Sequence, residues 1–407
     1  TDQAILAVVG DGMKGRPGVS GHLFGALGRQ HINISAIAQG ASERNISCVI
    51  DSVQQTRALN AVHEAFFEVR RKLGLVIVGV GNIGAALLQQ LHQQRAYLRD
   101  QGFDVTVVAI ANSRRFAINR RGINLSRWRE ELTTSPYKMD LATLAQEVAA
   151  LDLTDVALVD CTASAAVVEA YPDFVDAGLH IVTPNKRANV LPWEQYEALL
   201  ELLRERQRHF LYEANVGAGL PIMSTLADLV ASGDQVAKIE GVFSGTLSYL
   251  FNHFDGSRPF SAIVEDARKL GLTEPDPRED LSGADVARKL LILARQVGGR
   301  LEIDDIKVES LAGLDDAALE RRRKRAAAKG CVLRYVGTLE GVKARAGLKE
   351  FPREHPIANT RGSDNIIAFT TNRYAKTPLV VQGPGAGADV TAMGVFSDIL
   401  KLLHYQG

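Results

Sequence analysis

A glycine-rich turn is the first feature of this sequence that could do chemistry. The apolar run 75–78 is typical of a strand buried on both faces. It leads into Gly79, Gly81 and Gly84, spaced as G-x-G-x-x-G, and a helix-forming stretch follows. Gly79 would permit the tight turn, Gly81 would leave room for a pyrophosphate, and Gly84 would let the helix pack closely. The pattern predicts a dinucleotide site, with an ordinary tight turn between a strand and a helix as the alternative.

Polar residues after the second predicted strand bear on which dinucleotide would bind. The strand covers residues 104–110, and Ser113, Arg114 and Arg115 follow it without a carboxylate among them. An NAD site usually has an acidic residue here for the ribose 2′-hydroxyl, whereas guanidinium groups suit a 2′-phosphate. The pattern favours NADP(H), with NAD(H) still possible. The alternative is that both arginines are only surface charges.

Two lysines have surroundings that suit proton transfer. Lys186 directly follows an apolar strand, at the edge where open α/β sheets bind ligands. Lys289 lies on the predicted helix 284–297, four residues after Asp285, so the two side chains share a face. An adjoining apolar stripe places Lys289 at the rim of buried surface, where a lysine can exchange protons near neutral pH. Each lysine could instead be a solvated surface charge.

Acidic residues precede that helix in the loop 273–281. Glu274 and Asp280 could bind a substrate ammonium group, or they could be solvated loop acids. Asp285 also has two interpretations, because Ser282-Gly-Ala-Asp285 matches a capping box in which Asp285 would only satisfy the helix start.

The segment 212–221, YEANVGAGLP, has glycines at 217 and 219 followed by Pro221. Its backbone carbonyls would point away from regular structure. They could coordinate a hard cation, which prefers oxygen ligands, or the segment could be a hinge between domains.

The elements that must position these side chains fall into three blocks. Residues 1–72 predict strands at 5–9, 32–38 and 45–53 and helices at 18–30 and 58–70, the second helix with Val69 in its apolar stripe. Residues 73–214 alternate strands (75–78, 104–110, 156–160) with helices (85–98, 141–151), which predicts an α/β fold with a doubly wound parallel sheet. Residues 215–381 predict helices at 222–231, 260–270 and 284–297 and strand-like sequence from 331 to 381.

Bulk composition argues against several function classes. The 407 residues include 47 Lys and Arg against 47 Asp and Glu, so no net field attracts nucleic acid or an anionic membrane, and we expect neither partner. The basic run 321–325 accordingly indicates a solvated helix face. Nothing approaches the ~18 apolar residues of a membrane span. The three cysteines lie far apart, which suits free thiols in the cytoplasm.

Seven motifs occur in an order that carries a family resemblance. They are GVGNIG (79–84), DCTAS (160–164), TPNKRAN (183–189), YEANVGAGLP (212–221), GVFSGTLSYLF (241–251), LGLTEPDPREDLSGADVARK (270–289) and GPGAGADVTAMGVFSDIL (383–400). Together they resemble homoserine dehydrogenase over residues 73–407. The N-terminal block, with NISAIAQG at 33–40, resembles the last ACT domain of an aspartokinase. The whole chain is similar to the C-terminal part of a bifunctional aspartokinase–homoserine dehydrogenase without its kinase region, which would explain a start at Thr1.

The resemblance implies three domains and one reaction. It implies a βαββαβ ACT domain at 1–72 and a Rossmann-type cofactor domain at 73–214 that residues 382–407 complete. Residues 215–381 would form an α+β substrate-binding and dimerisation domain. The implied reaction is the reversible NAD(P)H-dependent reduction of L-aspartate 4-semialdehyde to L-homoserine, in threonine and methionine biosynthesis.

The resemblance also implies residue roles, carried over by motif position. Lys289 would be the proton donor, and Lys186 would assist it while contacting cofactor and substrate. Substrate would be bound by Glu274, Asp285, Asp280, Gly245 and Thr246. Cofactor would be bound by Gly79, Gly81, Asn82, Ile83, Gly84, Ser113, Arg114, Arg115, Thr162, Lys186 and Gly387. Backbone carbonyls of Glu213, Val216, Ala218 and Leu220 would hold a sodium ion; Ala218 stands where many relatives have glycine.

Partners are implied in the same way. The family forms a homodimer or a higher homo-oligomer through the substrate domain. An ACT domain implies an amino-acid effector, most plausibly threonine, with Gln39 as a candidate contact. Two alternatives remain: another NADP-dependent reductase of a small amino acid semialdehyde, and a non-catalytic amino-acid sensor. The intact Lys186, Lys289 and Glu274 argue against the sensor.

Overall fold

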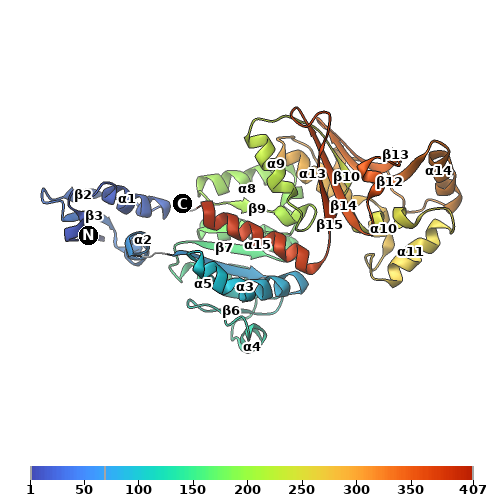
Figure 1. Cartoon of the computed structure of the whole chain (residues 1–407). Coiled ribbons are helices and arrows are strands. Elements are labelled where there is room, and N and C mark those ends of the chain that lie inside the picture. The colour runs from blue at the N-terminus through green and yellow to red at the C-terminus, as the bar shows by residue number, and fades with distance from the viewer. Residues whose placement is uncertain (1, 68–69, 406–407) are drawn as a thin grey trace.

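Three sheets divide the protein into three units (Figure 1). The computed structural model describes residues 2–67 and 70–405. We call the units the N-terminal unit (residues 2–67), the parallel unit (the sheet containing β4–β9, with its helices and α15) and the antiparallel unit (the sheet containing β10–β15, with its helices). None of the helices in these described residues is long and apolar enough to cross a membrane.

The N-terminal unit is a small antiparallel sheet with two helices. Its elements are β1 (Gln3–Val9), α1 (Val19–Arg29), β2 (Ala36–Gln39), β3 (Asn45–Asp51) and α2 (Gln55–Phe67), in the sheet order β1-β3-β2. Leu23, Leu27 and Val62 from the helices pack against Ile46 and Ile50 of β3. The periodicity of these apolar residues on one helix face and on alternate strand positions builds this core.

Two sequence expectations for this unit change in detail. The strand expected at 32–38 begins only at Ala36. The helix expected at 58–70 begins earlier, at Gln55, and is described to Phe67; Val69 lies outside the described residues, as do 406–407 of the expected C-terminal segment. The last strand of the implied βαββαβ pattern does not join this sheet, because β4 (Arg71–Val78) pairs with strands of the next unit.

The parallel unit has the dinucleotide-binding strand order. Its sheet runs β6-β5-β4-β7-β8-β9, and all neighbours are parallel except β5 and β6. The strands are β4, β5 (Phe103–Ala111), β6 (Phe116–Ile118), β7 (Val156–Asp160), β8 (Leu179–Val182) and β9 (Phe210–Leu211). The order reverses between β4 and β7, and the crevice at their carboxyl ends is where such sheets bind ligands.

Helices cover both faces of this sheet (Figure 1). One face packs against α3 (Asn82–Asp100) and α15 (Ala388–Tyr405), which supply Leu87, Leu91, Ile399 and Leu402 to one core. The other face packs against α5 (Leu141–Ala149), α7 (Tyr171–Asp176) and α8 (Trp193–Glu205). The short helices α4 (Trp128–Thr134) and α6 (Ala165–Glu169) lie in the connections. Burial on both faces explains why the strand sequences are continuously apolar.

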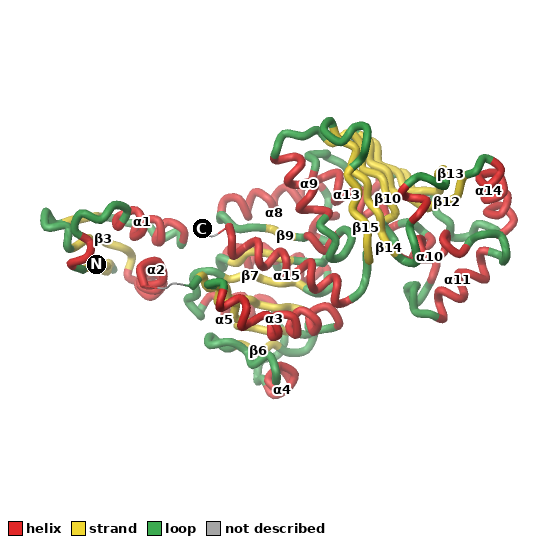
Figure 2. Tube along the Cα trace, in the orientation of Figure 1, coloured by secondary structure: helices red, strands yellow, loops and turns green. Residues whose placement is uncertain are grey.

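The antiparallel unit is a six-stranded sheet with helices against it, and its strands run side by side in Figure 2. The strand order is β11-β13-β12-β10-β14-β15, for β10 (Val236–Val242), β11 (Lys307–Val308), β12 (Cys331–Glu340), β13 (Lys343–Pro352), β14 (Asp364–Thr371) and β15 (Leu379–Pro384). The helices are α9 (Ile222–Ala231), α10 (Gly245–His253), α11 (Phe260–Lys269), α12 (Pro277–Leu281), α13 (Ala284–Gln296) and α14 (Asp316–Ala328).

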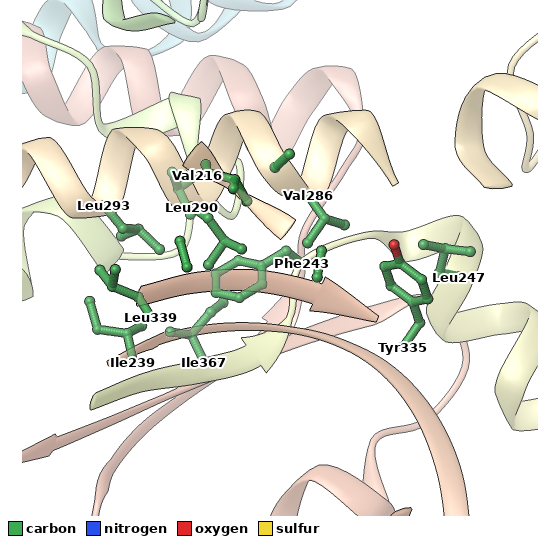
Figure 3. Close-up of a cluster of buried hydrophobic side chains, with 14 of the residues drawn as sticks. Val216, Ile239, Phe243, Leu247, Val286, Leu290, Leu293, Tyr335, Leu339 and Ile367 are labelled. Atoms are coloured by element: carbon green, nitrogen blue, oxygen red, sulfur yellow. The ribbon is translucent and has the colours of Figure 1, made fainter. Parts of the chain in front are cut away.

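The core of this unit lies between α13 and the sheet. Leu290 and Leu293 of α13 pack against Phe243, Leu339 and Ile367 (Figure 3). Most of the other side chains of α13 are buried as well. The basic run on α14 is a helix face whose charges pair with carboxylates, as Arg323 does with Glu320 at 2.7 Å.

The chain crosses between the parallel and antiparallel units twice. It leaves through residues 212–221, after β9, and returns through residues 385–387, between β15 and α15. The first crossing packs closely on α15: a Cβ on Gly219 would lie 2.5 Å from the carbonyl oxygen of Val390, and one on Gly394 would lie 2.7 Å from that of Ala218. Only glycine permits so close an approach.

Candidate active site

The glycine turn has the shape that a dinucleotide needs. Gly79 has a φ of 92°, and a Cβ there would meet Thr162 at 2.6 Å. A Cβ on Gly84 would lie 2.1 Å from the carbonyl oxygen of Gly79, so α3 packs tightly on the turn. Gly81, by contrast, faces open space, with nothing within 4 Å of its Cβ position. No side chain caps the start of α3, which leaves the N–H groups of Asn82 and Ile83 facing that space.

A buried carboxylate beside this turn organises the surrounding loops. Asp160 ends β7 next to Val78 and is fully buried. Its side chain accepts hydrogen bonds from the hydroxyl of Thr162 at 2.6 Å, the amide of Asn185 at 2.9 Å and the hydroxyl of Tyr171 at 2.8 Å. Burial and the nearby Asp160 charge raise the pKa of Tyr171 well above its ordinary value, so it stays a donor. Asp160 thus fixes Thr162, at the glycine turn, relative to the loop that carries Lys186.

The two lysines meet at one carboxylate. Lys289 Nζ lies 2.8 Å from Asp285 Oδ2, and Lys186 Nζ lies 3.6 Å from Asp285 Oδ1. Lys289 also donates to the carbonyl oxygen of Phe243 at 2.6 Å, and its side chain is only 9% exposed. The segment that follows β8 and the helix α13 come from different units, so this cluster forms at their junction. The structure therefore brings together three predicted site residues that lie up to 103 positions apart.

The charges of this cluster act on one another. Burial lowers the pKa of the Lys186 ammonium, the charges of Lys289 and Arg288 lower it further, and Asp285 only partly opposes them. Burial would raise the pKa of Asp285, but the charges of Lys289 and Lys186 outweigh it and hold that pKa well below its usual range. Asp285 therefore stays ionised at any physiological pH. The cluster has two positively charged groups and one negatively charged group, so a ligand with a negative or polar group would be attracted to it.

Asp285 does not cap its helix. The N-cap of α13 is Gly283, at a φ of 74°, and no side chain caps the helix there. The hydroxyl of Ser282 accepts the N–H of Ala284 at 3.2 Å instead. The capping-box interpretation of Asp285 is wrong, because its carboxylate is turned toward the two lysines.

Two hydrogen bonds hold the acidic loop 273–281 in place. Glu274 is exposed, and its backbone N–H donates to Asp280 Oδ2 at 2.8 Å. The hydroxyl of Thr246 donates to the carbonyl of Leu272 at 2.7 Å, which ties the loop to the start of α10. Gly245, the residue before Thr246, leaves room at this point: a Cβ there would lie 3.0 Å from the carbonyl oxygen of Ser363. Within the part of the chain that the structure describes, no hydrogen bond or ion pair joins Glu274 to the two lysines.

The two candidate arginines that follow β5 make different contacts. Asn112 Oδ1 accepts the backbone N–H groups of Arg114 at 2.8 Å and Arg115 at 2.9 Å, which forms a tight turn that exposes Ser113. The Arg115 guanidinium donates to the carbonyl of Ser135. The Arg114 side chain is exposed and makes no side-chain hydrogen bond within the described residues. Arg114 is thus the freer of the two guanidinium groups.

The crossing segment 212–221 is held by a buried ionic group. Glu213 accepts the N–H of Met223 at 2.8 Å and so caps α9, and its carboxylate lies 2.7 Å from Lys401 Nζ. Asp398 accepts the N–H of Glu213 at 2.7 Å and pairs with Lys401 at 2.9 Å. Ala218 has a φ of 55°, a left-handed conformation that explains why glycine suits this position. The return crossing is similarly turned, with Gly387 at a φ of 117°.

The doubly wound sheet with its open glycine turn, set beside a cluster of lysines, defines an NAD(P)-dependent oxidoreductase. The homoserine dehydrogenase NAD-binding model matches residues 79–213, and the homoserine dehydrogenase model matches residues 221–400. An ACT-domain model matches residues 6–66. The chain belongs to the homoserine dehydrogenase family and carries an ACT domain ahead of the dehydrogenase.

Relatives add the wider context. The chain is 46% identical to the chloroplastic bifunctional aspartokinase/homoserine dehydrogenase 1 of Arabidopsis thaliana, over 99% of this chain and 47% of that protein. It is 38% identical to the bifunctional aspartokinase/homoserine dehydrogenase of Haemophilus influenzae, over 99% of this chain and 52% of that protein. The chain thus spans about half the length of these relatives. A hyperthermophilic archaeal homoserine dehydrogenase, solved in complex with NADPH, shares the fold with a TM-score of 0.68 at 23% identity, over 83% of this chain and 99% of that one.

Sequence reasoning missed the groups that connect the site. Asp160 and Asn185 stand inside two of the quoted motifs, yet the sequence suggested no role for them. An acidic residue that ends the apolar run 156–159 was an available signal for Asp160. The Phe243 carbonyl that accepts from Lys289 had no such signal, because a backbone group shows its role only in the folded chain.

Proposed function

We propose that this chain catalyses the reversible NAD(P)H-dependent reduction of L-aspartate 4-semialdehyde to L-homoserine. The single observation that carries the proposal is the cluster of Lys186, Asp285 and Lys289 at the carboxyl edge of the parallel sheet. It lies where ligands of such sheets bind, and it combines a buried proton donor with an ionised carboxylate. The bound dinucleotide would supply or accept the hydride.

Lys289 is placed to move the proton. An ammonium group has three N–H donors. Two of them are directed to Phe243 O and Asp285 Oδ2, so one remains for the oxygen of the substrate's carbonyl or hydroxyl. Because two fixed acceptors orient Nζ, this last N–H is preoriented. Lys186, on the other side of Asp285, would hold the substrate and cofactor in place.

The acidic loop would recognise the amino acid end of the substrate. Glu274, Asp280 and Asp285 offer carboxylates to an ammonium group. Gly245 and Thr246 would lie against the substrate, and the bond from Thr246 to Leu272 supports the loop at this side. Thr162 and Gly387 would line the cofactor cleft.

For the cofactor we propose NADP(H), with NAD(H) accepted more weakly. Ser113 and Arg114 are exposed after β5, and no carboxylate occupies this turn. An unpaired guanidinium and a hydroxyl suit a 2′-phosphate. Arg115 would contribute less, since its guanidinium already binds Ser135.

We also propose a sodium ion held by carbonyls of Glu213, Val216, Ala218 and Leu220. The left-handed turn at Gly217 and Ala218, with φ of 80° and 55°, supports this proposal, because it turns successive carbonyls out of regular structure. The ion would then stiffen the crossing between the two units.

Three further proposals concern the whole chain. It would work in a reducing compartment such as the cytoplasm, since its cysteines Cys48, Cys161 and Cys331 are free. It would assemble as a homodimer or larger through the antiparallel unit, whose Val308, Val342 and Val380 are exposed apolar residues. Residues 73–214 with 382–407 would act as cofactor domain, 215–381 as substrate domain and 1–72 as regulatory domain.

The first test is a substrate panel with a lysine variant. Wild-type protein should oxidise homoserine with NADP⁺ much faster than 2-hydroxy acids or other amino alcohols. Lys289→Ala should lose at least ~100-fold in kcat, as expected for removal of a general acid, while NADPH affinity stays unchanged. Lys269→Ala is the control, because that lysine is 65% exposed on α11. A comparable loss of NADPH binding in Lys289→Ala would contradict the role given to this lysine.

A further inference from the structure

The far end of α13 carries a buried arginine that the proposed chemistry does not use. The Arg295 side chain is only 1% exposed. Its Nη1 donates to the carbonyl of Asn189 at 3.0 Å, and its Nη2 donates to the carbonyl of Leu301 and to Glu302 Oε2, both at 3.2 Å. The guanidinium lies 4.7 Å from the ring centre of Tyr196. Since Asn189 and Tyr196 belong to the parallel unit, Arg295 links the two units.

Other contacts join the same two surfaces. Glu302 Oε1 accepts the backbone N–H of Trp193, the first residue of α8, at 2.7 Å. The hydroxyl of Tyr212 donates to Gln296 Oε1 at 2.7 Å. The C-terminal end of α13 is therefore fastened to the parallel unit at several points.

These contacts lie close in sequence to both lysines. Asn189 is three residues after Lys186, and Arg295 is six residues after Lys289 on the same helix. From Asp285 to Arg295 a straight helix spans about 15 Å, so fixing its far end fixes where its near end points. At the near end the contact between units is the 3.6 Å pair of Lys186 and Asp285, with side chains 31% and 39% exposed. A partly exposed pair at this distance holds two units together weakly.

The chemistry of Arg295 also argues for a geometric role. Desolvating a charged group is costly, and an apolar pair of similar volume is often as stable. Its Nε has no hydrogen-bond partner among the described residues, so part of this cost is not recovered. A guanidinium, however, donates in fixed directions from one plane, which defines the relative placement of its acceptors.

We propose that Arg295 is a positioning residue of the reaction. It holds α13 against the 183–190 segment, so that Lys289 and Lys186 reach the same carboxylate from opposite units. The inference rests on the proposed function of the two lysines, and it assigns to Arg295 no contact with substrate or cofactor.

The test compares Arg295→Met with Arg300→Met. Both guanidinium groups lie over the Trp193 ring, Arg295 at 5.6 Å and Arg300 at 5.2 Å, but the Arg300 side chain is 72% exposed. Arg295→Met should lower kcat for homoserine oxidation at least about tenfold, because small misplacements of reacting groups are costly. NADPH affinity should stay within about twofold of the wild-type value, because Arg295 is assigned no contact with the cofactor and its loss should act on the reaction step. The deuterium isotope effect on kcat, from homoserine labelled at the alcohol carbon, should rise. Arg300→Met should behave as wild type.

A second readout needs no turnover. If α13 moves away, Lys186 loses its 3.6 Å ion pair with Asp285 and becomes more exposed, so an amine-acetylating reagent should label it faster in Arg295→Met. Should that variant fail to fold, Glu302→Gln replaces it, with the same expected directions. If both fold, the double variant should be no worse than Arg295→Met, because both act through one contact.

The outcomes separate the two proposals. An active wild type with unchanged kcat, isotope effect and Lys186 labelling in the variants would overturn the positioning role, even if thermal stability fell. A wild type that does not oxidise homoserine would overturn the proposed function instead. Lys186 labelling would then still decide whether Arg295 sets the geometry of the lysine cluster.

Discussion

Arg114 and Arg115 are neighbours in the chain but differ in the freedom of their guanidinium groups. The Arg115 guanidinium donates to Ser135, whereas Arg114 is held only through its backbone, by Asn112 and Met139. A guanidinium that is already engaged has fewer N–H groups for a ligand phosphate. At this position, therefore, the two arginines should not contribute equally to cofactor choice.

Arg114→Ala should weaken NADPH binding by about 10- to 100-fold, the value of one or two charge-assisted hydrogen bonds. NADH binding should change little, because NADH lacks the 2′-phosphate. Fluorescence titration with both cofactors measures this, with the exposed Arg127, which pairs with Glu130 at 2.8 Å, replaced by alanine as control. Equal weakening of both cofactors would refute the 2′-phosphate contact.

The turn between β4 and α3 allows a matched pair of substitutions at the scale of one element. A Cβ on Gly84 would lie 2.1 Å from the carbonyl of Gly79, so Gly84→Ala should destabilise the protein by roughly 1–3 kcal/mol. Gly81 has open space around it, so Gly81→Ala should leave the unfolding temperature nearly unchanged.

Cofactor binding should separate the same two variants further. The added methyl of Gly81→Ala would occupy the space expected for the pyrophosphate, so NADPH should no longer raise the unfolding temperature. Thermal unfolding with and without NADPH measures both effects. Normal stabilisation of Gly81→Ala by NADPH would place the dinucleotide elsewhere.

The sequence predicted elements best where the hydrophobic pattern was local and long. The helix expected at 284–297 is observed at 284–296, and the strand expected at 156–160 is observed unchanged. The strand expected at 32–38 starts too early, because residues 32–34 connect α1 to the sheet and the first bond to β3 is the one that the N–H of Ser35 donates to the carbonyl of Val49. Hydrophobic periodicity indicates which residues of a strand are buried, but not at which residue its hydrogen bonding to the next strand begins.

The site was predictable in its residue types and not in its connections. The motifs place Lys186 after a strand of the parallel sheet and Asp285 at the start of a helix. Only the packing of the two units brings these side chains within 3.6 Å of each other. For Arg295, the sequence indicates only a place in the predicted helix 284–297. Its role depends on carbonyls of Asn189 and Leu301, which carry no side-chain signal.

The junction between the N-terminal and parallel units matters for the molecule as a whole. Gln30 donates to the carbonyl of Thr154 at 2.9 Å, and Asn60 donates to that of Asp152 at 3.1 Å. Next to these contacts, burial raises the pKa of Asp155 to about 6; Glu64 adds to this rise, whereas Arg208 and Arg29 oppose it. Thus a carboxylate whose charge is disfavoured lies beside the place where the N-terminal unit contacts the parallel unit.

Asp155 should therefore make stability depend on pH. The pKa of Asp155 is 3.8 in the unfolded chain and about 6 in the folded protein, so between these pH values the folded state binds more protons than the unfolded state. The free energy of unfolding therefore falls as the pH rises through this range, and above about pH 6 the whole destabilising effect of the buried charge is present. Asp155→Asn should raise the free energy of unfolding at pH 8 by roughly 1–3 kcal/mol and change it little near pH 4. Urea unfolding at both pH values measures this, with the exposed Asp100→Asn as control. Destabilisation at pH 8 would mean that the attraction between the Asp155 and Arg208 charges outweighs the cost of burial.

The feedback control that we expect from the ACT domain would also involve the whole molecule. Gln39 ends the exposed strand β2, where it accepts a hydrogen bond from Ser20 at 3.4 Å. If threonine is the effector, it should inhibit homoserine oxidation, and Gln39→Ala should raise the half-inhibiting concentration without changing the uninhibited rate. A wild type that threonine does not inhibit would remove threonine as effector of this chain.

The double crossing of the chain has a consequence for its synthesis. Helix α15, which begins at Ala388, contributes Ile399, Leu402 and Leu403 to the core of the parallel unit, whose last strand ends at Leu211. The antiparallel unit is inserted between them in sequence. On the ribosome, the parallel unit must therefore wait with an exposed apolar face until residues 388–405 emerge, while the antiparallel unit can already pack. A stop or frameshift in the last helix should thus harm the parallel unit, although its strands are translated before the antiparallel unit.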